Sequence, residues 1–217
     1  LTAGRVSPNA VGINMEDCDG VQINTGGNSI TLSDAAMVIS NCDVVDTGSS
    51  LQGDGTASTH GINADDANGD ILTLSGTTVT GFENGVTKTS GELYLTGDAS
   101  LTGTVYGAYV DDATVSAITA SVDGGSTGTG LYVIDSDDVW VYPMNASGLV
   151  GMYVENSPFR WDGGTVDATT ALEVVEAQGS VENMTWTASD NQINAGSNAY
   201  VTSIGNTIDA SKLIVDP

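Results

Sequence analysis

Basic residues are scarce in this sequence. Four Lys and Arg stand against 28 Asp and Glu, which gives a formal net charge of −24. Proteins bind nucleic acid and anionic membranes through patches of Lys and Arg, so the composition argues against both kinds of partner. Many acids with few lysines suit saline surroundings, where mobile cations screen the repulsion between like charges. We therefore expect a salt-adapted protein.

Long apolar runs and metal-ligating side chains are also rare. No run of roughly 18 apolar residues occurs, so we expect no membrane insertion by this segment. The single histidine, His60, is distant from the two cysteines, which argues against a zinc site. The sequence begins at Leu1 without a signal-peptide pattern. We expect one domain, residues 1–217, cut from a larger protein, with residues 1–11 and 211–217 as caps or linkers.

What the sequence does contain is an internal repeat. A small residue opens each unit, and successive openers are separated by 20 to 25 residues. The openers are Gly12, Ala36, Gly61, Gly85, Gly107, Gly130, Gly151 and Ala171. A ninth, degenerate unit follows around residues 198–204. Near-constant spacing of this kind indicates supersecondary units stacked in one direction.

Equivalent positions in the units carry the same kind of residue. The residue after the opener is apolar in all eight units, and the residue two further on is apolar in every unit except the one that contains Lys88. Five residues after the opener stands a polar residue such as Asp17 or Asn41, and the next residue is small, as at Cys18. Apolar alternation on both sides of a polar corner indicates two short strands joined by a turn.

The repeat resembles that of the right-handed parallel β-helix family, which includes pectate-lyase-like enzymes and surface-protein domains. The resemblance covers roughly residues 10–210 and rests on the repeat pattern. It implies an all-β fold, a right-handed parallel β-helix (solenoid) of about nine coils, with strands of successive coils about 4.8 Å apart. Segments such as 100–102 and 165–167 suggest a third strand in each coil, and residues 123–129 a variable loop.

The motifs of the family's enzymes are missing. Its lyases use Arg or Lys to remove a proton beside a uronate, usually with Ca²⁺. Its hydrolases combine Asp residues with Gly-His-Gly and Arg-x-Lys segments. Here Arg5, Lys88, Arg160 and Lys212 are scattered, and the segment at His60 lacks the first glycine of Gly-His-Gly. We therefore expect no catalytic residues, with an atypical polysaccharide lyase or hydrolase as the remaining catalytic alternative.

Outward-facing aromatic residues form the most suggestive binding surface. Tyr109, Tyr132 and Tyr153 occupy the same position in three consecutive units, and Trp140 looks outward from the neighbouring face, with Arg160 beside it in the following coil. Exposed aromatic rings can bind the flat faces of sugars, which predicts a polysaccharide ligand. The alternative is a self-stacking ladder that stabilises the coils, with Arg160 against Trp140 in a cation–π contact.

Adjacent acidic residues recur at the polar corners of alternate units. Asp65 with Asp66 and Asp111 with Asp112 are two such pairs. Oxygen-rich corners of this kind could hold Ca²⁺, which takes carboxylate and carbonyl oxygens as ligands. The alternative is that Asp and Asn stand there because their side chains hydrogen-bond the backbone of a turn.

The two cysteines, Cys18 and Cys42, fall at the same position of adjacent units. Their Cα atoms are then expected about 4.8 Å apart, which lies within the range that a disulfide accepts. Small residues fill this position in other units, so plain packing explains the pair equally well.

A function follows from these features only as an expectation. We expect a non-catalytic structural or adhesive module of an extracellular or cell-surface protein, with a polysaccharide or another surface protein as its partner. Carbohydrate binding through the aromatic row is the alternative.

Overall fold

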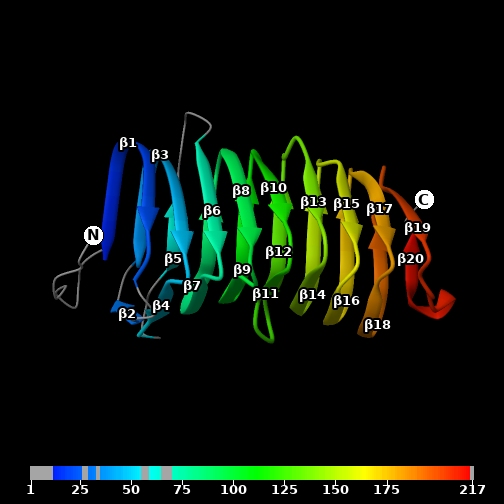
Figure 1. The fold of residues 1–217 in the computed structure, drawn as a ribbon. Helices are drawn as coiled ribbons and strands as arrows, with labels where there is room; N and C mark the ends of the chain where they lie inside the picture. Colours follow the sequence, from blue (N-terminus) through cyan, green and yellow to red (C-terminus); the bar gives the residue numbers. More distant parts are fainter. Residues whose placement is uncertain (1–11, 26–28, 33–34, 55–58, 65–69, 216–217) are drawn as a thin grey trace.

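The computed structural model describes residues 12–25, 29–32, 35–54, 59–64 and 70–215, drawn in colour in Figure 1. Its elements are β1 (Ile13–Ile23), β2 (Ser29–Leu32), β3 (Met37–Thr47), β4 (Ser50–Gly53), β5 (His60–Ala64), β6 (Ile71–Ser75), β7 (Thr78–Lys88), β8 (Gly91–Thr96), β9 (Ser100–Asp111), β10 (Ala113–Ala117), β11 (Ala120–Asp123), β12 (Thr129–Ile134), β13 (Val139–Val141), β14 (Met144–Glu155), β15 (Phe159–Asp162), β16 (Thr165–Val175), β17 (Gln178–Glu182), β18 (Thr185–Ala195), β19 (Tyr200–Ile204), β20 (Leu213–Val215) and the 3-10 helix η1 (Ala210–Lys212).

The strands stack into a parallel β-helix. Away from the two ends, strands pair in parallel with strands of the preceding and following coils, and the coils succeed one another from the N-terminal to the C-terminal end (Figure 1). The residues that follow the openers of adjacent coils lie opposite each other: Ile13 pairs with Met37, and Leu131 pairs with Met152. The chain is an all-β solenoid of about eight turns, close to the nine predicted. The described residues include no helix that is long and apolar enough to cross a membrane.

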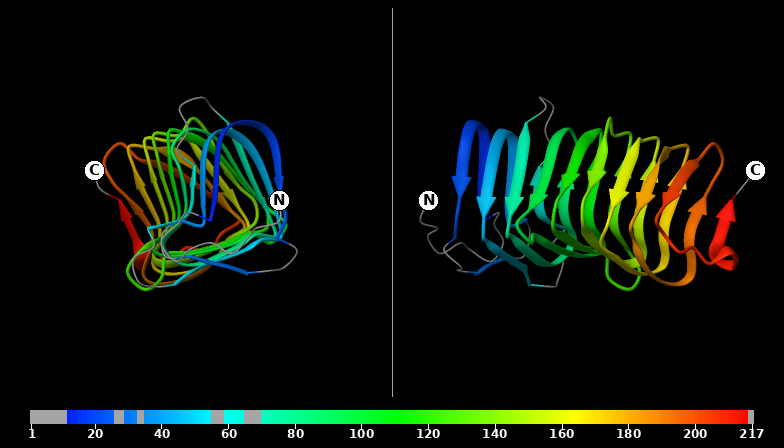
Figure 2. Two further views of the ribbon diagram at one scale, coloured as in Figure 1. Left: turned by 90° about the vertical axis from the view of Figure 1, so that its left-hand side faces the viewer. Right: turned by 45° about the vertical axis from the view of Figure 1, so that its right-hand side comes forward.

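Three faces surround the interior, which the view along the axis shows as a three-sided outline (Figure 2, left). The tyrosine face contains β5, β12, β20 and the adjoining parts of longer strands, such as residues 106–111 of β9. The tryptophan face contains β6, β8, β10, β13, β15, β17 and β19. The groove face contains β2, β4, β11 and the first parts of β7, β9, β14, β16 and β18.

Apolar columns from all three faces fill one continuous core. Leu131 and Met152 on the tyrosine face and Val141 on the tryptophan face are fully buried, as is Trp161, whose side chain is among the largest in the core. Lys88 is only 1% exposed, so this residue lies in the core as its position in the repeat predicted. Because neighbouring coils share the same core, the coils support one another along the axis.

The polar corners are explained by backbone geometry. Non-glycine residues with φ between +47° and +58° stand at this position: Asp17, Asn41, Asp112, Asp135, Asn156, Glu176 and Asn198. Asp and Asn tolerate this left-handed conformation better than other side chains do. The Nδ2 atom of Asn41 donates to Oδ1 of Asp17, and that of Asn156 to Oδ1 of Asp135, both at 2.6 Å. The corner residues therefore shape the turns and link adjacent coils.

Candidate functional site

The three predicted tyrosines form a continuous stack on the tyrosine face. The ring centroids of Tyr109 and Tyr132 are 5.4 Å apart with their planes at 8°, and those of Tyr132 and Tyr153 are 4.5 Å apart at 4°. Tyr106 packs against the stack, with its centroid 4.9 Å from that of Tyr132. Neighbouring rings cover both faces of Tyr132, so a sugar ring cannot stack on it. The geometry is that of a self-stacking ladder.

The phenol groups of two stacked tyrosines bond to carboxylates two residues further along the chain. The hydroxyl of Tyr109 donates to Asp111 at 3.2 Å, and that of Tyr153 donates to Glu155 at 2.7 Å. Burial, with the nearby carboxylate as the next cause, raises the pKa of Tyr109 to about 12 and also raises the pKa of Tyr153. Both phenols therefore remain neutral hydrogen-bond donors near pH 7, which suits a structural role.

Trp140 and Arg160 lie on a different face from the tyrosine stack. They pair in register between β13 and β15, and Trp140 is 46% exposed. Arg160 forms ion pairs with Asp162 at 3.4 Å and with Glu182 at 3.5 Å. Tyr142, two residues beyond Trp140, is 49% exposed and extends this aromatic surface. The predicted aromatic residues are thus divided between two faces, and the part on the tryptophan face offers the more exposed ring surface.

One of the predicted acidic pairs, Asp111 and Asp112, lies at a described corner, where β9 ends. Asp111 accepts the hydrogen bond from Tyr109, and Asp112 occupies a left-handed corner with a φ of 52°. Asp65 and Asp66 lie outside the described residues. Within the part of the chain that the structure describes, no three His, Cys, Asp or Glu side chains are grouped so that they could hold a metal ion. A Ca²⁺ site at these corners stays a prediction.

Cys18 and Cys42 are joined by a disulfide between adjacent coils. Their Cα atoms are 4.7 Å apart, because the parallel pairing of β1 with β3 places the two residues directly opposite each other. The bond ties together the first two coils of the described chain at the corner between the tyrosine and tryptophan faces.

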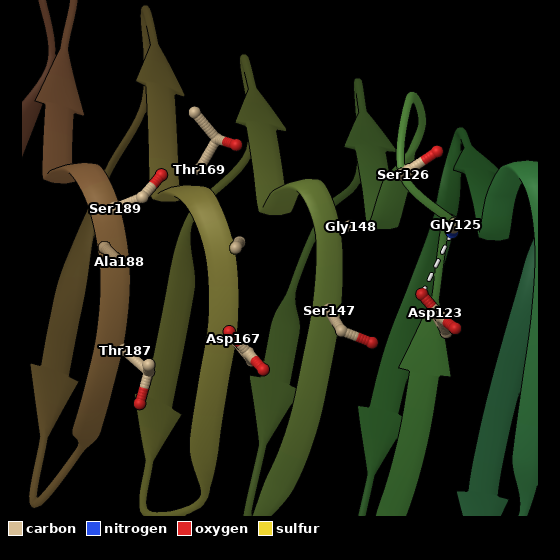
Figure 3. A pocket seen from close by; sticks show the side chains of 11 residues that line it. Asp123, Gly125, Ser126, Ser147, Gly148, Asp167, Thr169, Thr187, Ala188 and Ser189 are labelled. Atoms are coloured by element: carbon tan, nitrogen blue, oxygen red, sulfur yellow. Dashed lines mark hydrogen bonds between the residues drawn. The ribbon is translucent and has the colours of Figure 1, made fainter.

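A groove of about 600 Å³ runs along the groove face (Figure 3). Asp123, Ser147, Asp167 and Thr187 lie in a row along it, one from each of four successive coils, because β11, β14, β16 and β18 pair in register. The loop that follows β11 contributes Gly125 to the lining. The backbone N–H of Gly125 donates to Oδ1 of Asp123 at 2.9 Å, which fixes the orientation of this carboxylate.

Small residues hollow the surface where the strands bend from the groove face towards the tyrosine face. Gly148, Ala168 and Ala188 stand at equivalent positions of three coils and line the groove. A Cβ atom at residue 148 would come within 2.7 Å of the carbonyl oxygen of Gly128, and the φ of +144° favours glycine there. Ala168 and Ala188 are buried in the core, so no long side chain rises into the groove from these positions.

The groove is acidic and rich in hydroxyl groups. Asp123 and Asp167 supply carboxylates, Ser147 and Thr187 supply hydroxyls, and no basic side chain of the described residues lines it. Lys212 approaches its C-terminal end, where Nζ donates to the carbonyl oxygen of Ala188. Such a lining can hydrogen-bond a polar ligand, and it favours neutral or cationic ligands over anionic ones.

Sequence reasoning missed the groove residues for a physical reason. Their column reads Asp, Ser, Asp and Thr in successive coils, so it has no repeated residue type that would attract attention. The available signal was the run of small residues after them, Gly148, Ala168 and Ala188, each 20 residues from the next.

The fold and the groove together define a parallel β-helix protein with an elongated surface site. Comparisons with models of protein families, with curated proteins and with solved structures find no match. The architecture alone therefore defines the class, and membership of the pectate-lyase-like family is not shown.

Proposed function

We propose that this chain is a non-catalytic adhesive module that binds a saccharide chain along the groove face. The observation that carries the proposal is the groove, whose lining presents carboxylates and hydroxyls in a row over four coils. These groups donate to and accept from the hydroxyls of sugars. A site that extends along a solenoid suits a polymer better than a compact ligand.

The scaffold supports this role because it holds the site rigid. Asp123, Ser147, Asp167 and Thr187 stand on strands that are paired with neighbouring coils. Preformed sites lose little conformational entropy when they bind, so modest contacts suffice for adhesion. A rigid solenoid also serves as a spacer, which fits the expected setting in an extracellular or cell-surface protein.

Hydrolysis of a saccharide is the second candidate function, because two carboxylates share the groove. Asp123 and Asp167 stand two coils apart, about 9.6 Å by strand spacing. This separation is close to the upper limit, roughly 9.5 Å, for the two carboxyl groups of inverting glycosidases. The spacing of the two acids is the one observation that favours cleavage, whereas the row of carboxylates and hydroxyls over four coils favours binding. We therefore favour binding without cleavage.

A glycan array followed by calorimetry on the best oligosaccharide tests the proposal. We expect measurable binding and no shorter products when the mixture is separated by chromatography after long incubation. Release of shorter products that stops in Asp167→Asn would favour the hydrolase instead. Absence of binding to any saccharide would contradict the adhesive proposal.

Matched substitutions locate the ligand. Thr187→Trp fills the groove and is expected to abolish binding, whereas Thr202→Trp adds the same side chain at an exposed position of the tryptophan face and is expected to preserve it. Trp140→Ala is expected to leave binding unchanged. Loss of binding in Trp140→Ala with retention in Thr187→Trp would place the ligand on the tryptophan face.

A further inference from the structure

We infer that the groove selects saccharide chains that carry protonated amino groups, with Asp123 and Asp167 as the carboxylates that bind the ammonium groups. This inference rests on the proposed function, because it names the ligand class of the same site. It requires that the two acids stand in regular positions, that their oxygens are available, and that the surroundings favour a cation.

The two acids occupy alternate coils. Asp123 pairs with Ser147, and Ser147 pairs with Asp167, so one hydroxyl separates the carboxylates. Thr187 continues the row beyond Asp167, and Figure 3 shows the four side chains following one another along the coils. The strand spacing places the acids about 9.6 Å apart along the axis. A polymer that lies along the groove therefore meets a carboxylate at every second coil and a hydroxyl in between.

Each of the two carboxylates has an oxygen that can accept a hydrogen bond from a ligand. The bond from Gly125 goes to Oδ1 of Asp123, and no bond to Oδ2 is found among the described residues. Asp167 is exposed and accepts no hydrogen bond from the described part of the protein. An ammonium group that meets a carboxylate forms charge-assisted hydrogen bonds, which are about twice as strong as neutral ones. Amino groups on the ligand therefore add affinity that neutral hydroxyls cannot supply.

The surrounding charge favours a cation. The whole chain carries a formal charge of −24, which repels uronate polymers and attracts polycations. The one basic residue that reaches the groove, among those described, is Lys212. Its ammonium group bonds to the carbonyl oxygen of Ala188, which lies in the coil after that of Asp167. The carboxylates of Asp123 and Asp167 thus form no ion pair with a described residue.

A saccharide fits this lining better than a basic peptide does. The backbone groups of the groove face bond to neighbouring coils, as the N–H of Gly124 does to the carbonyl oxygen of Ser147 at 3.0 Å. An extended peptide would find few free backbone partners there, and such partners supply the affinity when a peptide joins a sheet. Sugar hydroxyls, in contrast, match the side-chain hydroxyls of Ser147 and Thr187.

Calorimetry with three oligosaccharides of equal length tests the inference: a glucosamine oligomer, its fully N-acetylated form and a neutral glucose oligomer. We expect the glucosamine oligomer to bind at least tenfold more tightly than the other two at low salt, and the preference to shrink as NaCl is added. Asp167→Asn and Asp123→Asn are each expected to weaken glucosamine binding roughly tenfold. Asp137→Asn removes the same charge at an exposed corner outside the groove and is expected to change little.

The possible outcomes separate this inference from the proposed function. Equal affinities for the three oligomers would overturn the amino-group selection and leave the saccharide site standing. Equal losses of glucosamine affinity in Asp137→Asn and Asp167→Asn would show that net charge alone causes the preference, and would overturn the assignment to the groove carboxylates. Tighter binding of an oligolysine of similar length, with the same sensitivity to Asp167→Asn, would replace the saccharide by a basic peptide. Binding of none of the oligosaccharides would contradict both.

Discussion

Tyr132 and Tyr153 lie face to face in successive coils, with ring centroids 4.5 Å apart and planes at 4°. Tyr109 covers the opposite face of Tyr132, so this ring makes two stacking contacts. Stacked aromatic pairs contribute about 0.5–1.5 kcal/mol beyond the area they bury. We expect Tyr132→Ala to lower the free energy of unfolding by roughly 2–3 kcal/mol, as measured by chemical denaturation.

Tyr142 provides the matched control for this substitution, because it is 49% exposed and lies outside the stack. Tyr142→Ala is expected to change stability by no more than about 0.5 kcal/mol. Equal losses in the two variants would show that the stack adds nothing beyond an ordinary surface tyrosine.

Reduction of the disulfide between Cys18 and Cys42 tests the N-terminal coils. The bond closes a loop with a sequence separation of 24 residues, and chain-entropy arguments give it about 3 kcal/mol of stabilisation. We expect a reductant to lower the denaturation midpoint of the wild-type chain. A variant with both Cys18→Ala and Cys42→Ala should have the lower denaturation midpoint from the outset, and the reductant should not change it. A midpoint that the reductant leaves unchanged in the wild-type chain would contradict the bond.

The repeat predicts the solenoid because each position meets the same surroundings in every coil. Leu131 is buried for the same reason as Met152, and Asp135 adopts the same left-handed corner as Asn156. Even Lys88 lies in the core that its position predicts, although lysine is rarely fully buried. Similar residues at equivalent positions of the repeat therefore predict the fold class and the approximate number of coils from the sequence alone.

The candidate site is much harder to predict from the sequence. The repeat brings Tyr109 next to Tyr132 but does not say whether the rings stack on each other or stay open to a ligand; that depends on side-chain orientation. Asp123 and Asp167 join one groove through the register of a strand whose outward residues differ from coil to coil. Outward positions face solvent, so packing does not force them to repeat, and their alignment appears only in three dimensions.

Asp46 makes stability depend on pH. This carboxyl group is fully buried beside Ser49 and Thr77, whose hydroxyls donate to it. Burial is the largest effect and raises the pKa of Asp46 above its ordinary 3.8. The folded state therefore holds the proton more tightly than the unfolded state does. The resulting stabilisation is fully present below pH 3.8 and is lost as the pH rises through the folded-state pKa.

Asp46→Asn removes this titration and is the direct test. The stability of Asp46→Asn relative to the wild-type chain is expected to rise with pH from about pH 4 and to level off above the folded-state pKa. Unfolding by urea at a series of pH values measures the difference. Asp137→Asn makes the same substitution at an exposed position and is the control for the loss of one carboxyl group. A difference between Asp46→Asn and wild type that stays constant over this range would contradict the raised pKa.

The net charge of −24 predicts a response to salt. Repulsion among surface carboxylates destabilises the compact state, and raising the ionic strength from 0.01 M to 1 M shortens the screening length from about 30 Å to about 3 Å. We expect the melting temperature to rise with NaCl over this range. Sucrose at equal osmolality controls for general solute effects. A melting temperature that is flat in NaCl, or that rises equally in sucrose, would contradict electrostatic screening.

Glu176 is a corner residue whose side chain suits its backbone poorly. Its φ is 49°, and the equivalent corner of the preceding coil holds Asn156 at 47°. The left-handed conformation costs most residues about 1–2 kcal/mol, and Asn tolerates it better. Glu176→Asn is therefore expected to stabilise the fold by roughly 0.5–1 kcal/mol in thermal or chemical denaturation. Glu16→Asn removes the same charge from an exposed position in β1, so an equal gain in both variants would point to charge relief and against backbone strain.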